Sequence, residues 1–227
     1  MTKVFCIIPA CNEVSRVGAV VRVARQSQLV TDGVWVVDNA SIDGTAQAAG
    51  AAGAKVLYHE VPGKGGAVAY AIETLCKPED IVLLLDADLR GLKVEHIDNL
   101  LKPVLDGGYI QSVGVRDSSL LKKLFWRFHV GLSGQRAFRA SLLWEIYWLD
   151  YQGWALEVAL NSICRWSPKR RKRQIAKALL VGVYDCPKSV KYDDVREVKA
   201  LRRQVAVQWL KGLIRFNLAV SLKHRLQ

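Results

Sequence analysis

The stretch IVLLLDAD (residues 81–88) decides the fold, because it joins the most apolar run of the chain to two acidic residues. Five consecutive apolar residues predict a strand that is buried on both faces. Asp86 and Asp88 follow, and two carboxylates one residue apart can share a hard divalent cation that also binds a diphosphate. Asp-x-Asp also occurs in simple strand-to-helix loops. The interpretation as a cation site therefore depends on which residues follow the other strands.

Three further apolar runs, at residues 4–8, 34–38 and 55–58, each precede a segment whose apolar residues have helical spacing. Continuous apolar strands that alternate with helices are typical of a parallel sheet covered on both faces. We therefore predict an α/β fold with a Rossmann-like, mostly parallel sheet and helices on both faces. In an open sheet of this kind, ligands bind at the carboxyl ends of the strands.

The composition fits a single globular domain. The chain has 227 residues, of which 51% are hydrophobic, so it can bury a sizeable core and is not expected to be disordered. No apolar run approaches the roughly 18 residues that a membrane-spanning helix needs. The five cysteines include no C-x-x-C pair, which argues against a disulfide framework or a zinc ribbon and favours reduced thiols in a cytoplasmic protein.

The positive charge is concentrated at the C-terminus. Residues 165–227 hold 17 of the 33 Lys and Arg residues but 4 of the 21 Asp and Glu residues, so the formal net charge of +12 comes from this quarter of the chain. From about residue 199 to 225, apolar residues recur at near-helical spacing among basic ones. We predict a main domain over residues 1–193 and a basic, amphipathic helical extension over residues 194–227. The extension either lies on an anionic membrane surface or packs on the domain.

The first two strands end in polar residues. Residues 9–13 read PACNE, where Pro9 and Ala10 would let a flat ring approach the backbone and Glu13 offers a polar group; the alternative is a turn that caps the next helix. Residues 36–45 read VVDNASIDGT, where Asp38 could accept hydrogen bonds from a base or ribose and Asn39 could donate one. We interpret residues 43–45 as a cap of the next helix only.

The third strand leads into PGKGG (residues 62–66), ahead of a helix expected over residues 67–76. Glycines allow a phosphate to approach the backbone, and Lys64 would supply a positive charge. The spacing is not that of a nucleoside-triphosphate P-loop, and a plain turn is the alternative. Together, four consecutive strand ends offer a base pocket, a ribose or base acceptor, a phosphate lysine and a carboxylate pair, which indicates nucleotide chemistry.

These segments resemble the family-2-like glycosyltransferases with a GT-A-type fold. The resemblance covers nearly the whole chain and rests on PACNE (9–13), VVDNASIDGT (36–45), GKGGA (63–67), LLDADL (84–89), LSGQRAF (132–138), WALEVALN (154–161) and GVYDCPKSVK (182–191). It implies a metal-dependent enzyme that transfers a sugar from a UDP- or GDP-linked donor. The implied acceptor is a polyprenyl phosphate or another phosphorylated or hydroxyl compound.

The resemblance also implies roles for individual residues. Lys64 would contact the diphosphate, and Asp88 would bind Mg²⁺ or Mn²⁺ with Asp86 behind it. Relatives often carry a histidine after the last core strand, where this chain has Asp185; aspartate binds the same cations, so Asp185 is either a third metal ligand or a loop residue. The implied nucleoside contacts are Pro9, Ala10, Glu13, Asp38, Asn39 and Asp86.

The sequence defines the acceptor side less sharply. A hydroxyl acceptor needs a base, for which Glu157 and Asp150 are candidates, and Glu157 is otherwise a plain helix residue. A phosphate acceptor is already ionised and needs cationic side chains instead. Arg136 is the first candidate for such a contact, ahead of Arg116 and Arg139.

Two other function classes stay open. Sugar-1-phosphate nucleotidyltransferases share the early sheet, but they need a Gly-rich, Arg-containing loop after the first strand, and PACNE contains neither residue. A non-catalytic, basic membrane- or nucleic-acid-binding module would explain the C-terminal charge. It would not need every donor-site residue type, and the chain has no nucleic-acid motif, so nucleic acid is not an expected partner. We expect a cytoplasmic protein. Whether it also binds peripherally to the inner face of the membrane is left open.

Overall fold

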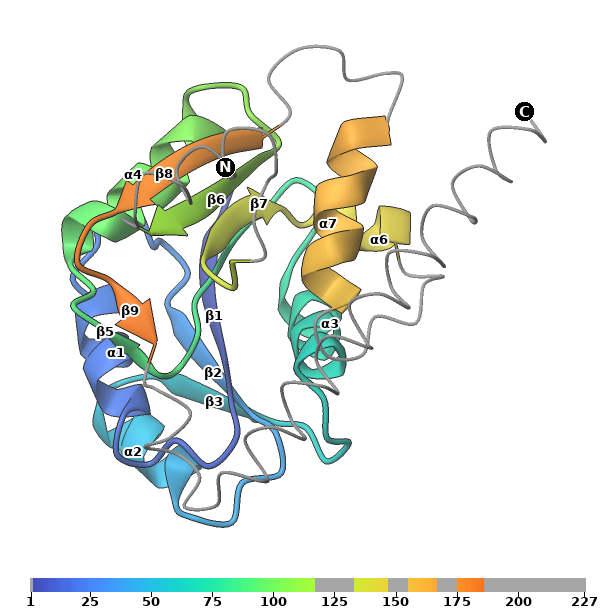
Figure 1. Cartoon of the computed structure of the whole chain (residues 1–227). Helices are drawn as coiled ribbons and strands as arrows, with labels where there is room; N and C mark the ends of the chain where they lie inside the picture. Colours follow the sequence, from blue (N-terminus) through green and yellow to red (C-terminus); the bar gives the residue numbers. More distant parts are fainter. Residues whose placement is uncertain (1, 117–132, 147–154, 167–174, 186–227) are drawn as a thin grey trace, which may run out of the picture.

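The computed structural model describes residues 2–116, 133–146, 155–166 and 175–185, and the fold is built from these parts. A seven-stranded sheet has the order β3-β2-β1-β4-β7-β6-β8 (Figure 1). β7 runs antiparallel to both of its neighbours, and the other pairs are parallel. The strands are β1 (Val4–Ala10), β2 (Val34–Asp38), β3 (Lys55–Tyr58), β4 (Ile81–Leu84), β6 (Gln111–Arg116), β7 (Arg136–Arg139) and β8 (Ile175–Leu180).

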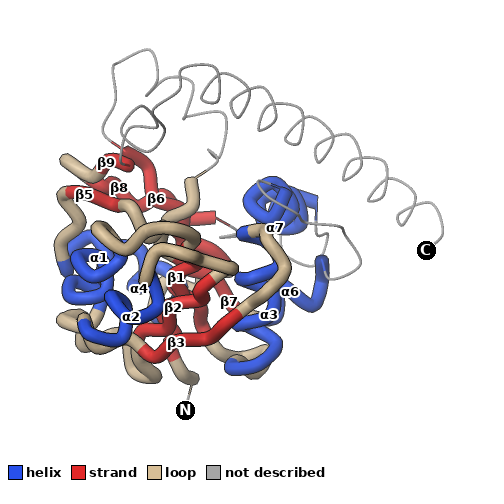
Figure 2. The backbone as a smooth tube through the Cα atoms, turned by 90° about the horizontal axis from the view of Figure 1, so that it is seen from below, coloured by secondary structure: helices blue, strands red, loops and turns tan. Residues whose placement is uncertain are grey.

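Helices cover both faces of this sheet, as Figure 2 shows. One face carries α1 (Val17–Ala24), α2 (Thr45–Ala51) and α4 (Val94–Leu105), and the other carries α3 (Lys64–Leu75), α6 (Ser141–Ile146) and α7 (Ala155–Trp166). A small antiparallel sheet of β5 (Leu89–Arg90) and β9 (Tyr184–Asp185) lies beside it. The predicted α/β fold with a mostly parallel sheet is confirmed.

The continuous apolar strands follow from this layering. In β1, Cys6 and Ile8 pack into the core under α1, whereas Phe5 and Ile7 pack into the core under α3. Successive side chains of a strand point to opposite faces of the sheet. In a strand covered on both faces every side chain is therefore buried, which favours apolar residues at every position. The same rule makes the run at residues 81–85 apolar throughout.

Three elements differ from the sequence-based expectation. α3 begins at Lys64 rather than near residue 67, so the lysine and the following glycines form its first turn. Residues 136–139, for which we predicted no strand, form β7 in the middle of the sheet, and the helix that follows begins at Ser141. β6 also lies in a stretch for which we predicted no strand.

Some predictions fall outside the described residues. These are the C-terminal extension over residues 194–227, the proposed domain boundary at residue 193, and Asp150. The side chain of Arg116 is likewise not described. Among the described parts of the chain, no helix combines the length and the apolar character that crossing a membrane requires.

Candidate active site

The carboxyl ends of the central strands bring the predicted donor residues to one edge of the sheet. Ala10 lies opposite Asp38 in the β1–β2 register, and Asp38 lies opposite Tyr58 in the β2–β3 register. The backbone N–H of Leu85, just past β4, donates to the carbonyl of Ile7 (3.1 Å). The ends of β1, β2, β3 and β4 therefore form one continuous edge, as the fold class predicts.

The loops that follow β1 and β2 are bonded to each other. The N–H of Asn12 donates to Ser41 Oγ (3.0 Å), and Asn12 Oδ1 accepts from the N–H of Ile42 (3.0 Å). The N–H of Glu13 donates to Thr45 Oγ1 (2.8 Å). Asn12 also has a φ of 56°, a conformation that a non-glycine residue keeps only when its surroundings enforce it.

The interpretation of residues 43–45 as a helix cap is correct in part: Asp43 Oδ1 accepts from the N–H of Thr45, the first residue of α2 (3.0 Å), but the same residues also bind the loop after β1. Asp43 Oδ2 accepts from the N–H of Val14 across the two loops (3.1 Å), and the N-cap of α2 is Gly44, which has no side chain to contribute. Several backbone contacts and the Thr45 hydroxyl hold the pKa of Asp43 below its usual value, although burial acts in the opposite direction. Asp43 therefore stays a carboxylate that joins the two loops near neutral pH.

The other residues of the first loop are mostly enclosed. Pro9 is half-buried and Ala10 is buried at the end of β1. Glu13 is also buried, and its Oε2 pairs with Arg16 Nη1 (2.9 Å). These positions border the edge where the nucleoside contacts were predicted, and their contact with a ligand remains a prediction.

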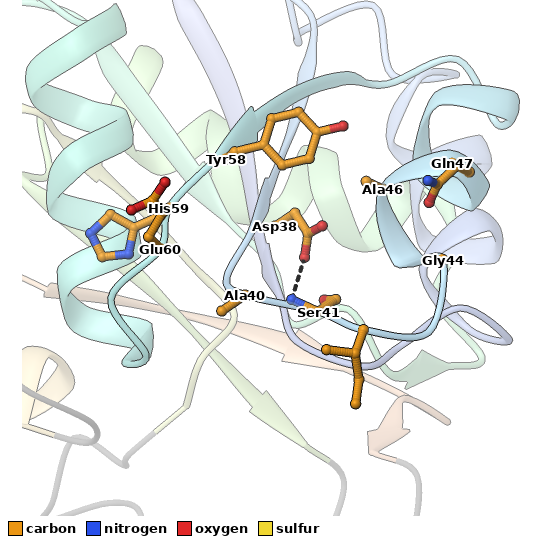
Figure 3. Close-up of a pocket in the computed structure, with 10 residues that line it drawn as sticks. Asp38, Ala40, Ser41, Gly44, Ala46, Gln47, Tyr58, His59 and Glu60 are labelled. Atoms are coloured by element: carbon orange, nitrogen blue, oxygen red, sulfur yellow. Dashed lines mark hydrogen bonds between the residues drawn. The ribbon is translucent and has the colours of Figure 1, made fainter.

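A pocket of about 300 Å³ opens beside Asp38, between the ends of β2 and β3. Asp38 is buried, and its Oδ1 accepts from the N–H of Ser41 (3.2 Å). The exposed ring of Tyr58 forms the opposite wall, and Gln47 of α2 closes a third side (Figure 3). The pocket thus presents a fixed carboxylate next to a flat apolar surface, which suits a planar, hydrogen-bonding ligand.

Asn39, the next residue, points elsewhere. Its Oδ1 accepts from the N–H of Gly63 (2.7 Å), and its Nδ2 lies 2.7 Å from the carbonyl of Val61 and 3.1 Å from that of His59. Its own N–H donates to the carbonyl of Ala10 (2.8 Å). Asn39 thus joins the ends of β1 and β2 to the segment that precedes Lys64.

Lys64 lies between two carboxylates from different parts of the chain. Its Nζ is 2.7 Å from Asp86 Oδ1 at the end of β4 and 2.8 Å from Glu157 Oε1 on α7. Burial alone would lower the pKa of Lys64, but the attraction of Asp86 and Glu157 raises it above the ordinary value of 10.5. The lysine is a permanent cation at neutral pH, in the first turn of α3, where the helix dipole also favours an anion.

Glu157 is fully enclosed, and only part of its carboxylate is satisfied. Oε1 accepts from Lys64, whereas Oε2 has no hydrogen-bond partner among the described residues. A buried carboxylate oxygen without a partner is unfavourable by roughly 1–3 kcal/mol. The structure therefore brings Glu157 to the predicted site and leaves it one unused acceptor.

Gln135 is a site residue that sequence reasoning missed. It is fully buried, its Nε2 donates to Asp86 Oδ2 (2.6 Å), and its Oε1 accepts from Ser133 Oγ (2.9 Å). A Cβ added at Gly134 would overlap the Asp86 carboxylate, so any larger residue there must displace that carboxylate. The signal was present in the LSGQRAF segment (132–138), but there we assigned a role only to Arg136.

Arg136 does not reach the cleft. It is fully buried, donates from Nε and Nη2 to the carbonyl of Ser133 (3.1 and 2.6 Å), and lies 3.2 Å from both Gln111 Oε1 and Asn161 Oδ1 through Nη1. Burial lowers its pKa from the usual 12.5, and the nearby Glu157 acts in the opposite direction. These contacts give Arg136 a structural environment and do not support the predicted phosphate contact. Arg139 lies opposite Ile81, at the far end of β4 from Asp86.

Asp88 and Asp185 come from distant segments and lie near each other. Leu89, next to Asp88, pairs with Asp185 in the β5–β9 register. Both aspartates are half-buried. Across the described segments, no three His, Cys, Asp or Glu side chains are grouped closely enough to form a metal cluster. Mg²⁺ commonly binds through one or two carboxylates together with substrate phosphates, so these oxygen donors still suit such an ion.

The arrangement of elements is similar to that of solved glycosyltransferases. A structure of glucosyl-3-phosphoglycerate synthase from Mycobacterium tuberculosis with phosphoglyceric acid matches with a TM-score of 0.73 at 21% identity, covering 93% of this chain and 80% of that chain. The same protein with Mn²⁺, UDP-glucose and phosphoglyceric acid gives the same TM-score, identity and coverage. Its complex with Mg²⁺ and UDP gives 0.72 at 21% identity, covering 93% and 79%. At this identity the likeness establishes a shared fold.

The sequence itself carries the family assignment. A search of the curated proteins found no match. The model of "Glycosyl transferase family 2" matches residues 5–163, from β1 into α7. This match confirms the resemblance inferred from the strand-end motifs, and it confirms the predicted glycosyltransferase class. The chain belongs to glycosyl transferase family 2.

Proposed function

We propose that the protein transfers a sugar from a UDP- or GDP-linked donor to an acceptor that carries a phosphate. The observation that carries this proposal is the position of Lys64, a permanent cation held between Asp86 and Glu157. It lies at the helix N-terminus next to the strand ends where nucleotides bind in open α/β sheets. Family membership supports the sugar-transfer chemistry.

On the donor side, the diphosphate would take the place of a carboxylate next to Lys64. The lysine and the first turn of α3 would hold the negative charge that develops when the bond to the sugar breaks. Asp38 would accept a hydrogen bond from the base or ribose, and the pocket beside it supports this role because it pairs that carboxylate with the ring of Tyr58.

We further propose Mg²⁺ or Mn²⁺ as the cofactor, bound through one or two of the carboxylates of Asp86, Asp88 and Asp185 together with the diphosphate of the donor. The oxygen donors and their grouping around β5 and β9 fit a hard cation. When bound, the ion would supply electrostatic stabilisation of the departing diphosphate. Complexes of the Mycobacterium tuberculosis synthase contain Mn²⁺ or Mg²⁺ together with a uridine nucleotide, which supports the choice.

On the acceptor side, Glu157 is the proposed group that accepts a hydrogen bond from the reacting hydroxyl. Its unused Oε2 supports this role. Because Glu157 is fully buried while Lys64 is bound to it, the role requires Lys64 to turn toward a diphosphate first. For an acceptor that reacts through its phosphate, Glu157 would have no proton to take, since that phosphate is already ionised.

The phosphate of the acceptor has two possible sources, a small metabolite or a polyprenyl chain. The structural relatives contain phosphoglyceric acid or glycerol 3-phosphate, which supports a small acceptor. The concentration of positive charge in residues 165–227 supports contact with an anionic lipid surface, and we retain cytoplasmic, membrane-peripheral localisation as part of the proposal for the lipid case.

The test combines purified protein, Mn²⁺, a panel of UDP- and GDP-sugars, and three acceptors: 3-phosphoglycerate, glycerol 3-phosphate and a polyprenyl phosphate in detergent. Release of UDP or GDP that depends on one acceptor, with a glycosylated product by mass spectrometry, is the expected result. The matched variant Asp88→Asn should lose this activity. Failure to bind any nucleotide with Mn²⁺, measured by calorimetry, would overturn the proposal.

The two alternative functions receive no support. The family match concerns sugar transfer and not nucleotidyl transfer. PACNE (residues 9–13), at the end of β1, contains neither the glycine nor the arginine that a nucleotidyltransferase needs there. A purely binding module would not require a lysine shared between two carboxylates at the nucleotide edge.

A further inference from the structure

Asn39 directs both of its N–H donors and its amide oxygen at one segment, residues 59–63. An asparagine offers two N–H donors and an oxygen that can accept up to two hydrogen bonds. Oδ1 accepts from the N–H of Gly63, and Nδ2 lies within hydrogen-bonding distance of the carbonyls of His59 and Val61. His59 Nδ1, 3.1 Å away, is a further neighbour of the same Nδ2. Asn39 is 5% exposed, so a nucleoside could reach its amide only by breaking these bonds.

The segment 59–63 has few other bonds to hold it. It has no regular secondary structure, and Glu60, Val61 and Pro62 are exposed. Its N–H at His59 donates to the carbonyl of Asp38 (2.9 Å), and Pro62 has no N–H to donate. Gly63 has a φ of 145°, which favours glycine. Asn39 therefore supplies contacts at alternate residues along an exposed segment that has no regular secondary structure.

This segment ends at Lys64. The helix α3 begins there, and Lys64 Nζ reaches Asp86 and Glu157 at 2.7 and 2.8 Å. A shift of about 1 Å in the preceding backbone would be enough to remove hydrogen bonds of that length. The His59 ring adds a second contact to α3, because it packs near the Tyr70 ring (5.4 Å between centroids).

We propose that Asn39 is a positioning residue, which fixes the segment 59–63 and through it the place of Lys64, and that it does not contact the nucleoside. This inference rests on the proposed function, because it gives Lys64 the diphosphate as its ligand. It also replaces the nucleoside contact that the sequence suggested for Asn39. Asp38, the preceding residue, keeps that role, because its carboxylate lines the pocket.

The test uses Asn39→Asp, which keeps the size and the acceptor but cannot donate to the two carbonyls. Its affinity for UDP and GDP with Mn²⁺ is measured by calorimetry, alone and in a Lys64→Met background. If Asn39 acts through Lys64, Asn39→Asp weakens binding about tenfold in the wild-type background and less than twofold in the Lys64→Met background, since coupled residues are not additive. An equal loss in both backgrounds would overturn the inference in favour of direct contact.

A second readout needs no nucleotide. Hydrogen exchange of the amides in residues 59–66 is expected to be faster in Asn39→Asp and in Asn39→Ser, the variant used if the first does not fold. Ser27→Ala is the matched control, because it removes a different buried hydrogen bond, Ser27 Oγ to Asp98 (2.7 Å), beyond the far end of α1. Unchanged exchange together with unchanged affinity would overturn the inference. If the wild type binds no nucleotide but exchange responds as expected, the proposed function fails and the role of Asn39 in the segment stands.

Discussion

The two halves of the sheet hold their site residues in different ways. In the half formed by β1, β2, β3 and β4, most side-chain contacts go to the backbone of a neighbouring loop, as those of Asn12, Ser41, Asp43 and Asn39 do. In the half around β6, β7 and α7, buried charged and amide groups, Arg136, Glu157 and Gln111, lie next to the half-buried Asn161. The first half is a rigid edge for a nucleotide, and the second is a buried network in which each member depends on the others. Lys64 and Gln135 connect the two.

Replacement of Lys64 should have the largest effect, because both halves depend on it. Lys64→Met removes the cation from Asp86 and Glu157, and we expect kcat/KM for the nucleotide sugar to fall by about 100- to 1000-fold, as for loss of one group that stabilises developing charge. Lys55→Met is the matched control, since Lys55 lies on β3 over the Trp35 ring and away from the carboxylates. If Lys64→Met kept more than half of the wild-type activity, the two halves of the site would not depend on Lys64, and the proposed donor site would be contradicted.

Replacement of Arg136 tests whether the second half is a structural network. Arg136→Met removes a buried cation near Glu157, which keeps its ion pair with Lys64, and takes one hydrogen-bond donor from Gln111 Oε1 and from Asn161 Oδ1. The free energy of unfolding in urea should therefore fall by about 3 kcal/mol. Arg139→Met, on the same strand but half-buried, should lower it by less than about 0.5 kcal/mol. A variant with wild-type stability and a raised KM for the acceptor would instead restore the phosphate contact that the sequence suggested.

The same contrast explains what could be predicted from the sequence. The strands β1, β2, β3 and β4 were predicted within two residues of their observed ends, because each is a local run of apolar residues followed by turn chemistry. β7 carries two arginines in four residues, RAFR, and its central place depends on partners far along the chain. Arg136 meets Gln111 across 25 residues, and Lys64 meets Glu157 across 93.

For the site, residue types were more predictable than their contacts. Lys64, Asp86 and Glu157 were predicted and do converge. The sequence could not show that the N–H groups of Arg136 and Asn39 donate to groups inside the protein. Those partners come close only when the chain folds. For the same reason Gln135, a buried partner of Asp86, had no visible role in its motif.

Gly134 lies just before β7, next to Asp86 at the end of β4, so a methyl group added there tests how the two halves meet. Gly134→Ala places its Cβ against the Asp86 carboxylate, so Asp86 must shift away from Lys64 and Gln135. We expect activity to fall about tenfold, since a displacement near 1 Å in a site is already costly. Gly50→Ala is the control: it lies on α2 with open space around it, and should leave activity unchanged while stabilising the protein by about 0.5–1 kcal/mol. Equal activity in the two variants would mean that the position of Asp86 matters little.

The smallest effect concerns pH, and it distinguishes a fixed cation from a titrating base. Because Asp86 and Glu157 raise the pKa of Lys64 above 10.5, the stability that its charge contributes is fully present below the unfolded value of about 10.4 and is lost only as the pH rises through the folded one. The difference in unfolding free energy between wild type and Lys64→Met should therefore change by less than about 0.3 kcal/mol between pH 7 and 9. Urea denaturation at the two pH values measures it. A difference that shrinks by about 1 kcal/mol or more across this range would mean that Lys64 loses its proton near neutral pH. In that case Lys64 could act as a base, and the two halves would be joined by a titrating group instead of a fixed charge.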